Sequence, residues 1–181
     1  MKKIVSIFIA LGTILLVPII AYFVLTASTP NVYAVQEKVL YNLPYPGILP
    51  DNPLYFVKII RDRITEFAIR DNSKKAEFYL LTSDKRVAMA QALSKKGKDK
   101  MAIETYSKSE KYFLMIPPLV KESKKQGVGP TSGFIDILKL SNSKHREVGE
   151  ILLKELPSGM SESVTQALKL NEEVLRLIEK L

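Results

Sequence analysis

The chain has 181 residues, with 27 basic and 19 acidic side chains, a formal net charge of +8, one histidine and neither cysteine nor tryptophan. The lack of cysteine excludes disulfides, thiol nucleophiles, iron–sulfur ligands and a lipid-modified cysteine. A single histidine without cysteine also argues against a zinc site.

The first predicted element is an apolar segment, Ile4–Leu25, whose 22 residues carry no charge and follow Lys2 and Lys3. A transmembrane helix needs about 20 such residues, whereas the apolar part of a cleaved signal has about 7–15. The length therefore favours a membrane anchor, and the two lysines favour a cytoplasmic amino end with the rest of the chain outside. Cleavage after Ala34, within the small-x-small sequence Val32-Tyr33-Ala34, is the alternative and would give a secreted domain.

A proline-rich arm follows the anchor or signal of residues 1–34 and covers residues 35–53. Four prolines lie between positions 44 and 53, and proline disfavours helix while favouring extended segments and turns. The arm is also apolar and aromatic, which an ordinary linker is not. We therefore expect it to lie along the helical domain, with Tyr45 and Ile48 packed on the bundle.

Residues 54–181 are predicted to form a helical domain. Five helices are expected, one beginning at Pro53 and the others over about 74–93, from about 99, up to about 156, and from 161 to near 181. Pro117-Pro118 should kink or break the third helix, because each ring displaces a carbonyl one turn earlier. Short links between helices imply antiparallel neighbours. The predicted fold class is therefore all-α, an antiparallel bundle of about five helices behind one N-terminal transmembrane or signal helix.

Apolar side chains recur at three- and four-residue spacing in the expected helices, as is typical of helices that pack in a bundle. In the first helix this set is Val57, Ile60, Ile64 and Phe67. In the last helix Asn171 interrupts the apolar set.

Two strings in the arm and the first two helices resemble a known family. They are LPYPGILPDNPLYFVKIIRDRI and KKAEFYLLTSDKRVAMA. The proline arm Leu43–Tyr55, the Arg61-Asp62 pair and the segment Lys74–Arg86 are similar to the family described as the domain of unknown function numbered 5667. The resemblance covers roughly the first third of the exported part. It implies a small helical domain commonly behind a membrane segment or signal, and it implies no reaction or catalytic residue.

Catalytic and metal-binding patterns are not evident. His145 has no Gly-x-Ser-x-Gly nucleophile signature to accompany it, so we expect a partly buried or interfacial histidine and no triad. Asp51-Asn52 and Asp71-Asn72 precede helices and are expected to cap them, not to bind calcium. The sequence therefore predicts no enzyme activity, no cofactor and no metal site.

Charged residues of the matched strings have two interpretations. Arg61-Asp62-Arg63 and Asp84-Lys85-Arg86 could face a ligand that carries an anionic group. We favour ion pairs that fix the register of the helices, such as Lys58 with Asp62 at i,i+4 spacing.

Two sets of residues are candidates for binding a partner. Tyr41, Tyr45 and Tyr55 could form a groove for another envelope protein. Four lysines could instead hold anionic lipid headgroups, a wall polymer or DNA: Lys95, Lys96, Lys98 and Lys100. Neither a groove-reading helix nor aromatics among the lysines indicates specific nucleic-acid binding. The favoured hypothesis is a membrane-tethered extracytoplasmic domain with a binding or structural role in the cell envelope, and polyanion binding is the alternative.

Overall fold

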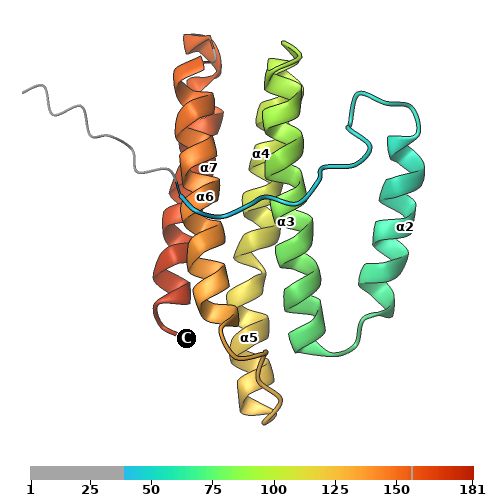
Figure 1. The fold of residues 1–181 in the computed structure, drawn as a ribbon, viewed down its shortest axis with the longest axis vertical. Coiled ribbons are helices and arrows are strands. Elements are labelled where there is room, and N and C mark those ends of the chain that lie inside the picture. Colours follow the sequence, from blue (N-terminus) through green and yellow to red (C-terminus); the bar gives the residue numbers. More distant parts are fainter. Residues whose placement is uncertain (1–38, 156) are drawn as a thin grey trace, which may run out of the picture. The chain divides into compact units, whose positions relative to one another are not determined.

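The structure, a computed structural model, describes residues 39–155 and 157–181. Its regular elements in this part are all helical (Figure 1): α2 (Tyr55–Ala68), α3 (Asn72–Ser94), α4 (Asp99–Leu114), α5 (Ile116–Lys125), α6 (Phe134–Glu155), the short 3-10 helix η1 (Ser158–Met160) and α7 (Ser161–Ile178). The predicted all-α class is confirmed. The predicted anchor or signal lies outside the described residues. Within the ranges given above, no helix is long and apolar enough to span a bilayer.

Four helices, α3, α4, α6 and α7, pack together as the bundle, and α5 follows α4 at one end (Figure 1). Two apolar clusters form the core. The cluster nearer α5 contains Ala76, Tyr79, Leu80, Phe113, Ile116, Val120, Phe134, Leu138, Val174 and Ile178. The other contains Val87, Ala90, Ile103, Tyr106, Val148, Leu152, Val164 and Ala167. Along each of the four helices, buried polar residues lie between the two clusters in sequence.

The predicted break at Pro117-Pro118 is confirmed. Helix α4 ends at Leu114 and α5 begins at Ile116, with the prolines in its first turn. Proline is tolerated there because the first-turn N–H groups have no partner within the helix. The single helix expected in this part of the chain is therefore two helices, α4 and α5.

Capping is confirmed for one of the two predicted pairs. Asp71 accepts a 2.8 Å hydrogen bond from the backbone N–H of Lys74 at the start of α3. The prediction for Asp51-Asn52 was wrong, because α2 begins only at Tyr55 and its first turn has no side-chain cap. Asn52 instead accepts from the Leu54 N–H, and Asp51 forms ion pairs with lysines of the α3–α4 turn.

Gly149 allows the close approach of α4 and α7 to α6. An alanine Cβ at this position would lie 2.6 Å from Cζ of Tyr106 and 2.7 Å from Cδ2 of Leu168. The Tyr106 hydroxyl donates a 3.0 Å hydrogen bond to the carbonyl of His145, one turn earlier on α6. A larger residue would force this buried tyrosine away from its acceptor.

The arm crosses the bundle and then turns away toward α2 (Figure 1). Its first part is fixed, since the Val39 N–H donates to Glu147 and the Tyr41 hydroxyl donates to Asp84. The expectation that Tyr45 packs on the bundle was wrong, because its side chain is 83% exposed. Ile48 is also exposed, so the bundle holds the arm before these two residues and again after them, at Asp51.

Candidate functional site

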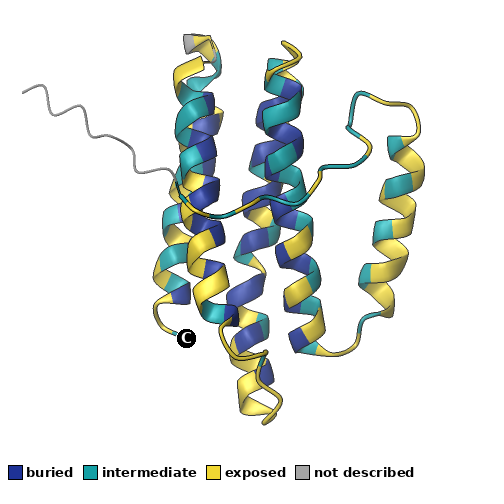
Figure 2. Cartoon of the chain, viewed as in Figure 1, coloured by how far each residue is buried: buried dark blue, intermediate teal, exposed yellow. Residues whose placement is uncertain are grey.

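Helix α2 contributes no buried residue to the fold, as the absence of dark blue on it in Figure 2 shows. Phe56, Ile60, Ile64 and Phe67, spaced by three or four residues, lie along one side of it and form what we call the outer face of α2. Their exposed fractions are 67%, 44%, 65% and 78%. Exposed apolar surface of this kind marks an interaction site in soluble domains.

The polar side of α2 is directed toward α3 and α4. Glu66 accepts a 2.8 Å hydrogen bond from the hydroxyl of Tyr79, and Arg86 donates to the hydroxyl of Tyr55. Lys58 and Asp62 form the predicted ion pair at 3.0 Å. These contacts set the rotation of α2 and leave its apolar side facing outward.

An apolar hollow of about 410 Å³ lies where the arm approaches the start of α2. Its walls include Tyr45, Ile48, Leu54 and Val57. The last two are exposed and continue the outer face of α2 toward the arm. The hollow therefore joins apolar side chains of the arm and of α2, and three basic side chains also line it: Lys58, Arg61 and Lys85.

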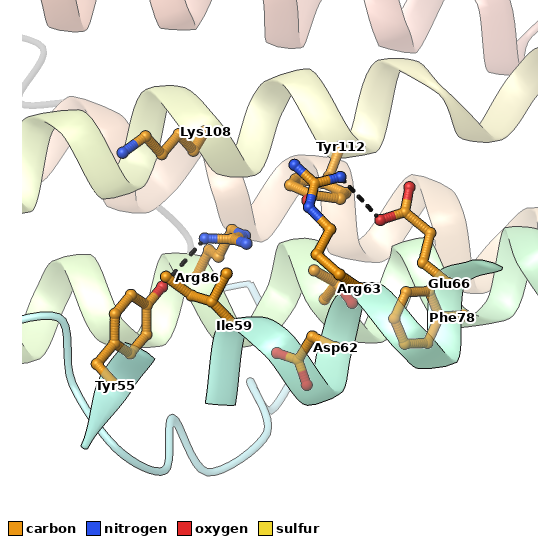
Figure 3. Close-up of a pocket in the computed structure, with 10 residues that line it drawn as sticks. Tyr55, Ile59, Asp62, Arg63, Glu66, Phe78, Arg86, Lys108 and Tyr112 are labelled. Atoms are coloured by element: carbon orange, nitrogen blue, oxygen red, sulfur yellow. Dashed lines mark hydrogen bonds and ion pairs between the residues drawn. The ribbon is translucent and has the colours of Figure 1, made fainter. Parts of the chain in front are cut away.

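A second, more polar groove of about 280 Å³ lies on the inner side of α2, against α3 and α4 (Figure 3). The guanidinium carbon of Arg86 lies 4.6 Å from the ring centre of Tyr112. Lys108, one turn before Tyr112 on α4, lines the same groove.

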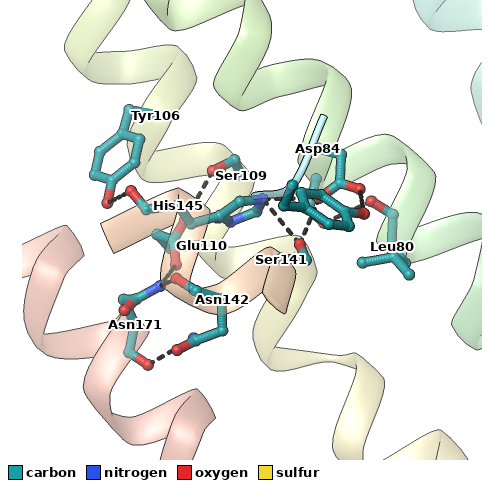
Figure 4. A network of polar contacts seen from close by, with 11 residues as sticks. Leu80, Asp84, Tyr106, Ser109, Glu110, Ser141, Asn142, His145 and Asn171 are labelled. Atoms are coloured by element: carbon teal, nitrogen blue, oxygen red, sulfur yellow. Dashed lines mark hydrogen bonds and ion pairs between the residues drawn. The ribbon is translucent and has the colours of Figure 1, made fainter. Parts of the chain in front are cut away.

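A buried polar layer crosses the bundle between its two apolar clusters (Figure 4). His145 of α6 lies at its centre, with Nε2 2.9 Å from Oδ1 of Asp84 and Nδ1 2.9 Å from Oε1 of Glu110. Asn171 of α7 donates to the second oxygen of Glu110, and Ser141 donates to Asp84 at 2.6 Å. The layer thus joins α3, α4, α6 and α7.

Electrostatics keep His145 protonated. Burial by itself would lower the pKa of His145, but the Glu110 charge and hydrogen bonds to Asp84 and Glu110 outweigh burial and raise this pKa to about 9. Both ring nitrogens then donate, which leaves no lone pair for a general base. Ser141 and Glu110 are fully buried as well, and Asp84 is 3% exposed. The histidine predicted to be partly buried is completely buried.

The three tyrosines proposed as a partner groove lie in different places. Tyr41 is bonded to the buried polar layer, Tyr45 borders the apolar hollow, and Tyr55 lines the inner groove. They do not form one site. The outer face of α2 was not predicted as a site, although the spacing of its residues was the signal that could have indicated it.

The candidate lysines cluster at the turn from α3 to α4. Lys96 and Lys98 lie 3.2 and 3.0 Å from Oδ2 of Asp51 and hold the end of the arm to this turn. Lys95 and Lys100 are exposed on either side of them. Part of the positive charge is therefore already neutralised within the domain.

The fold defines a small all-helical domain with an exposed amphipathic helix ahead of its bundle. A family model described as a domain of unknown function (DUF5667) matches residues 47–180. The chain belongs to this family, and the match extends through the C-terminal helices. Comparison with curated proteins and with solved structures finds no match to the chain.

Proposed function

We propose that this chain is a membrane-tethered extracytoplasmic domain with a binding and structural role in the cell envelope. In this proposal the segment Ile4–Leu25 anchors the chain, and the outer face of α2 lies on the outer surface of the same membrane. Cleavage after Ala34 would instead release the domain, and the mass of the mature chain distinguishes the two.

The outward orientation of α2 is the observation that carries the proposal. An amphipathic helix normally turns its apolar side to the core, whereas α2 bonds its polar side to the bundle through Glu66 and Tyr55. Four large apolar side chains consequently face away from the domain. A helix that lies in a membrane interface has this distribution of side chains.

Basic side chains next to the outer face of α2 support a lipid surface as the partner that covers this face. Arg61 and Arg63 have side chains that are 68% and 67% exposed. At about 100° per residue, Arg61 lies about 105° from the centre of the outer face on one side, and Arg63 lies about 55° from it on the other. Long basic side chains at these borders can extend to headgroups while their aliphatic parts cover apolar surface.

The tether keeps α2 near the membrane. Thirteen residues separate Leu25 from Val39, and a chain of that length spans at most about 45 Å. If the anchor is in the bilayer, a short connection raises the effective concentration of the membrane surface around α2. A weak apolar contact is then sufficient for docking.

Polyanion binding through the lysine cluster, the alternative function, has less support. Two of its four lysines already form ion pairs with Asp51. Exposed side chains with opposite charges nearby give little net attraction for a polymer at physiological salt.

The depth of α2 in a bilayer tests this proposal directly. The chain has no cysteine, so a single introduced cysteine can carry a nitroxide label in the full chain, reconstituted in nanodiscs that contain anionic lipid. A label at Ile64→Cys should be accessible to oxygen and protected from a water-soluble nickel complex. Leu140→Cys, an exposed apolar position on α6, is the matched control and should stay accessible to nickel.

Two results would count against this proposal. Equal nickel accessibility at both positions would show that α2 remains in water. Dipolar broadening between labels at position 64, with nickel protection, would instead indicate that a second copy covers the outer face of α2.

A further inference from the structure

The inner groove of α2 is lined by two cations from the bundle, Arg86 and Lys108. It runs between α2, α3 and α4, on the side of α2 opposite to its outer face (Figure 3). Its apolar walls are Ile59, Phe78 and Tyr112. Arg86 and Lys108 extend into the same space from α3 and α4.

Arg86 is held in place without a counterion. Its guanidinium stacks on Tyr112, with the carbon 4.6 Å from the ring centre, and one terminal nitrogen lies 3.3 Å from the hydroxyl of Tyr55. Its Nε is buried and has no hydrogen-bond acceptor. In residues 39–155 and 157–181, the two carboxylates that line the groove, Asp62 and Glu66, form their ion pairs with cations of α2 and not with this guanidinium. A partly buried charge of this kind is costly unless an anion approaches it.

The acidic residues of the groove are already engaged. Asp62 lies 3.0 Å from Lys58 and 2.7 Å from Arg61. Glu66 lies 3.0 Å from Arg63 and accepts from Tyr79. Lys108 has no ion pair with any described carboxylate. Arg86 and Lys108 therefore line the same groove without an ion pair to its carboxylates.

We propose that this groove binds a small organic oxyanion, a carboxylate or phosphate ester attached to a flat apolar group. The anionic oxygens would lie between Arg86 and Lys108, since a guanidinium offers paired donors to planar oxyanions. The apolar group would pack on Ile59 and Phe78. This site is separate from the outer face of α2 and does not depend on membrane docking.

Binding of phenyl phosphate to the full chain in zwitterionic nanodiscs tests the proposal by isothermal titration. We expect saturable 1:1 binding, with benzoate binding at the same site and benzyl alcohol, which lacks the charge, not binding. Inorganic phosphate should bind more weakly because it lacks the apolar group. Competition by anionic nanodiscs would identify a lipid headgroup as the source of the phosphate, and no competition would identify a soluble ligand; either result supports the site.

Variants assign the binding to the two cations. Arg86→Gln should weaken phenyl phosphate binding at least about tenfold, the loss expected for one hydrogen bond to a charged group. Lys108→Gln should also weaken it. Lys111→Gln, an exposed lysine on α4 outside the groove, is the matched control and should bind normally.

Lys108 is exposed, so its variant should fold normally and keeps the test valid even if Arg86→Gln does not fold. Absence of saturable binding, or equal binding by Lys108→Gln and Lys111→Gln, would overturn the proposal.

Discussion

Replacing His145 with leucine should destabilise the domain by on the order of 3–5 kcal/mol. The imidazolium lies between the carboxylates of Asp84 and Glu110, each 2.9 Å from one ring nitrogen. Leucine would leave two negative charges in the core with no cation between them. Urea unfolding followed by circular dichroism measures this loss.

Two comparisons isolate the charge effect. Arg146→Leu, at the adjacent position, removes a half-exposed ion pair with Glu150 and should cost less than about 1 kcal/mol. Adding Asp84→Asn and Glu110→Gln to His145→Leu should recover part of the lost stability, because the buried charges are then gone. If His145→Leu were no more destabilising than Arg146→Leu, the buried polar layer would not contribute as described.

Stability should also fall as the pH rises from about 6.5 to above 9. The pKa of His145 is raised from 6.5 to about 9 in the folded domain, so between these values the folded state holds a proton that the unfolded chain has released. The stabilisation is therefore fully present below pH 6.5 and is lost as the pH rises through 9. Its size is on the order of 3 kcal/mol.

Two carboxylates and several uncharged side chains surround His145. Asp84 faces it from α3 and Glu110 from α4, while Asn171 of α7 and Ser141 of α6 are neutral. Burial raises the pKa of the Tyr41 hydroxyl well above its usual value, so it continues to donate to Asp84. Chemical unfolding at several pH values between 6 and 10 measures how the free energy of unfolding changes with pH. His145→Gln should remove most of this pH dependence. A free energy of unfolding that rises with pH in the parent chain would contradict its assignment to His145.

Local sequence signals predicted where the helices lie in the chain better than they predicted which side chains of different helices contact each other. Asp71 caps α3, the prolines at 117 and 118 separate α4 from α5, and the apolar spacing placed each helix close to its observed range. These features depend on residues within one or two turns of each other. Such short-range chemistry is visible in a single sequence.

The buried polar layer depends instead on residues far apart in the chain. Asp84, Glu110 and Asn171 come from three helices, and only the fold brings the first two to His145 and the third to Glu110. Their positions gave a partial signal, because Asn171 interrupts an apolar set. The sequence does not show which distant side chains would form hydrogen bonds or ion pairs with these buried polar residues.

The orientation of α2 was unpredictable for a similar reason. The spacing of Val57, Ile60, Ile64 and Phe67 shows that the helix is amphipathic, and burial of this side was the natural expectation. The opposite side has polar partners on α3, among them Tyr79 and Arg86. Those contacts are the reason that the apolar side faces outward.

The proposed extracytoplasmic location of the helical domain is tested most directly by labelling intact cells. Lys121→Cys places a thiol on an exposed position of α5, and Ser83→Cys places one at a position that is 0% exposed. In cells stripped of their outer layers, a membrane-impermeant maleimide should label position 121 as fully as it does after lysis. It should label position 83 only after denaturation. Labelling of position 121 only after lysis would contradict a membrane-tethered extracytoplasmic domain.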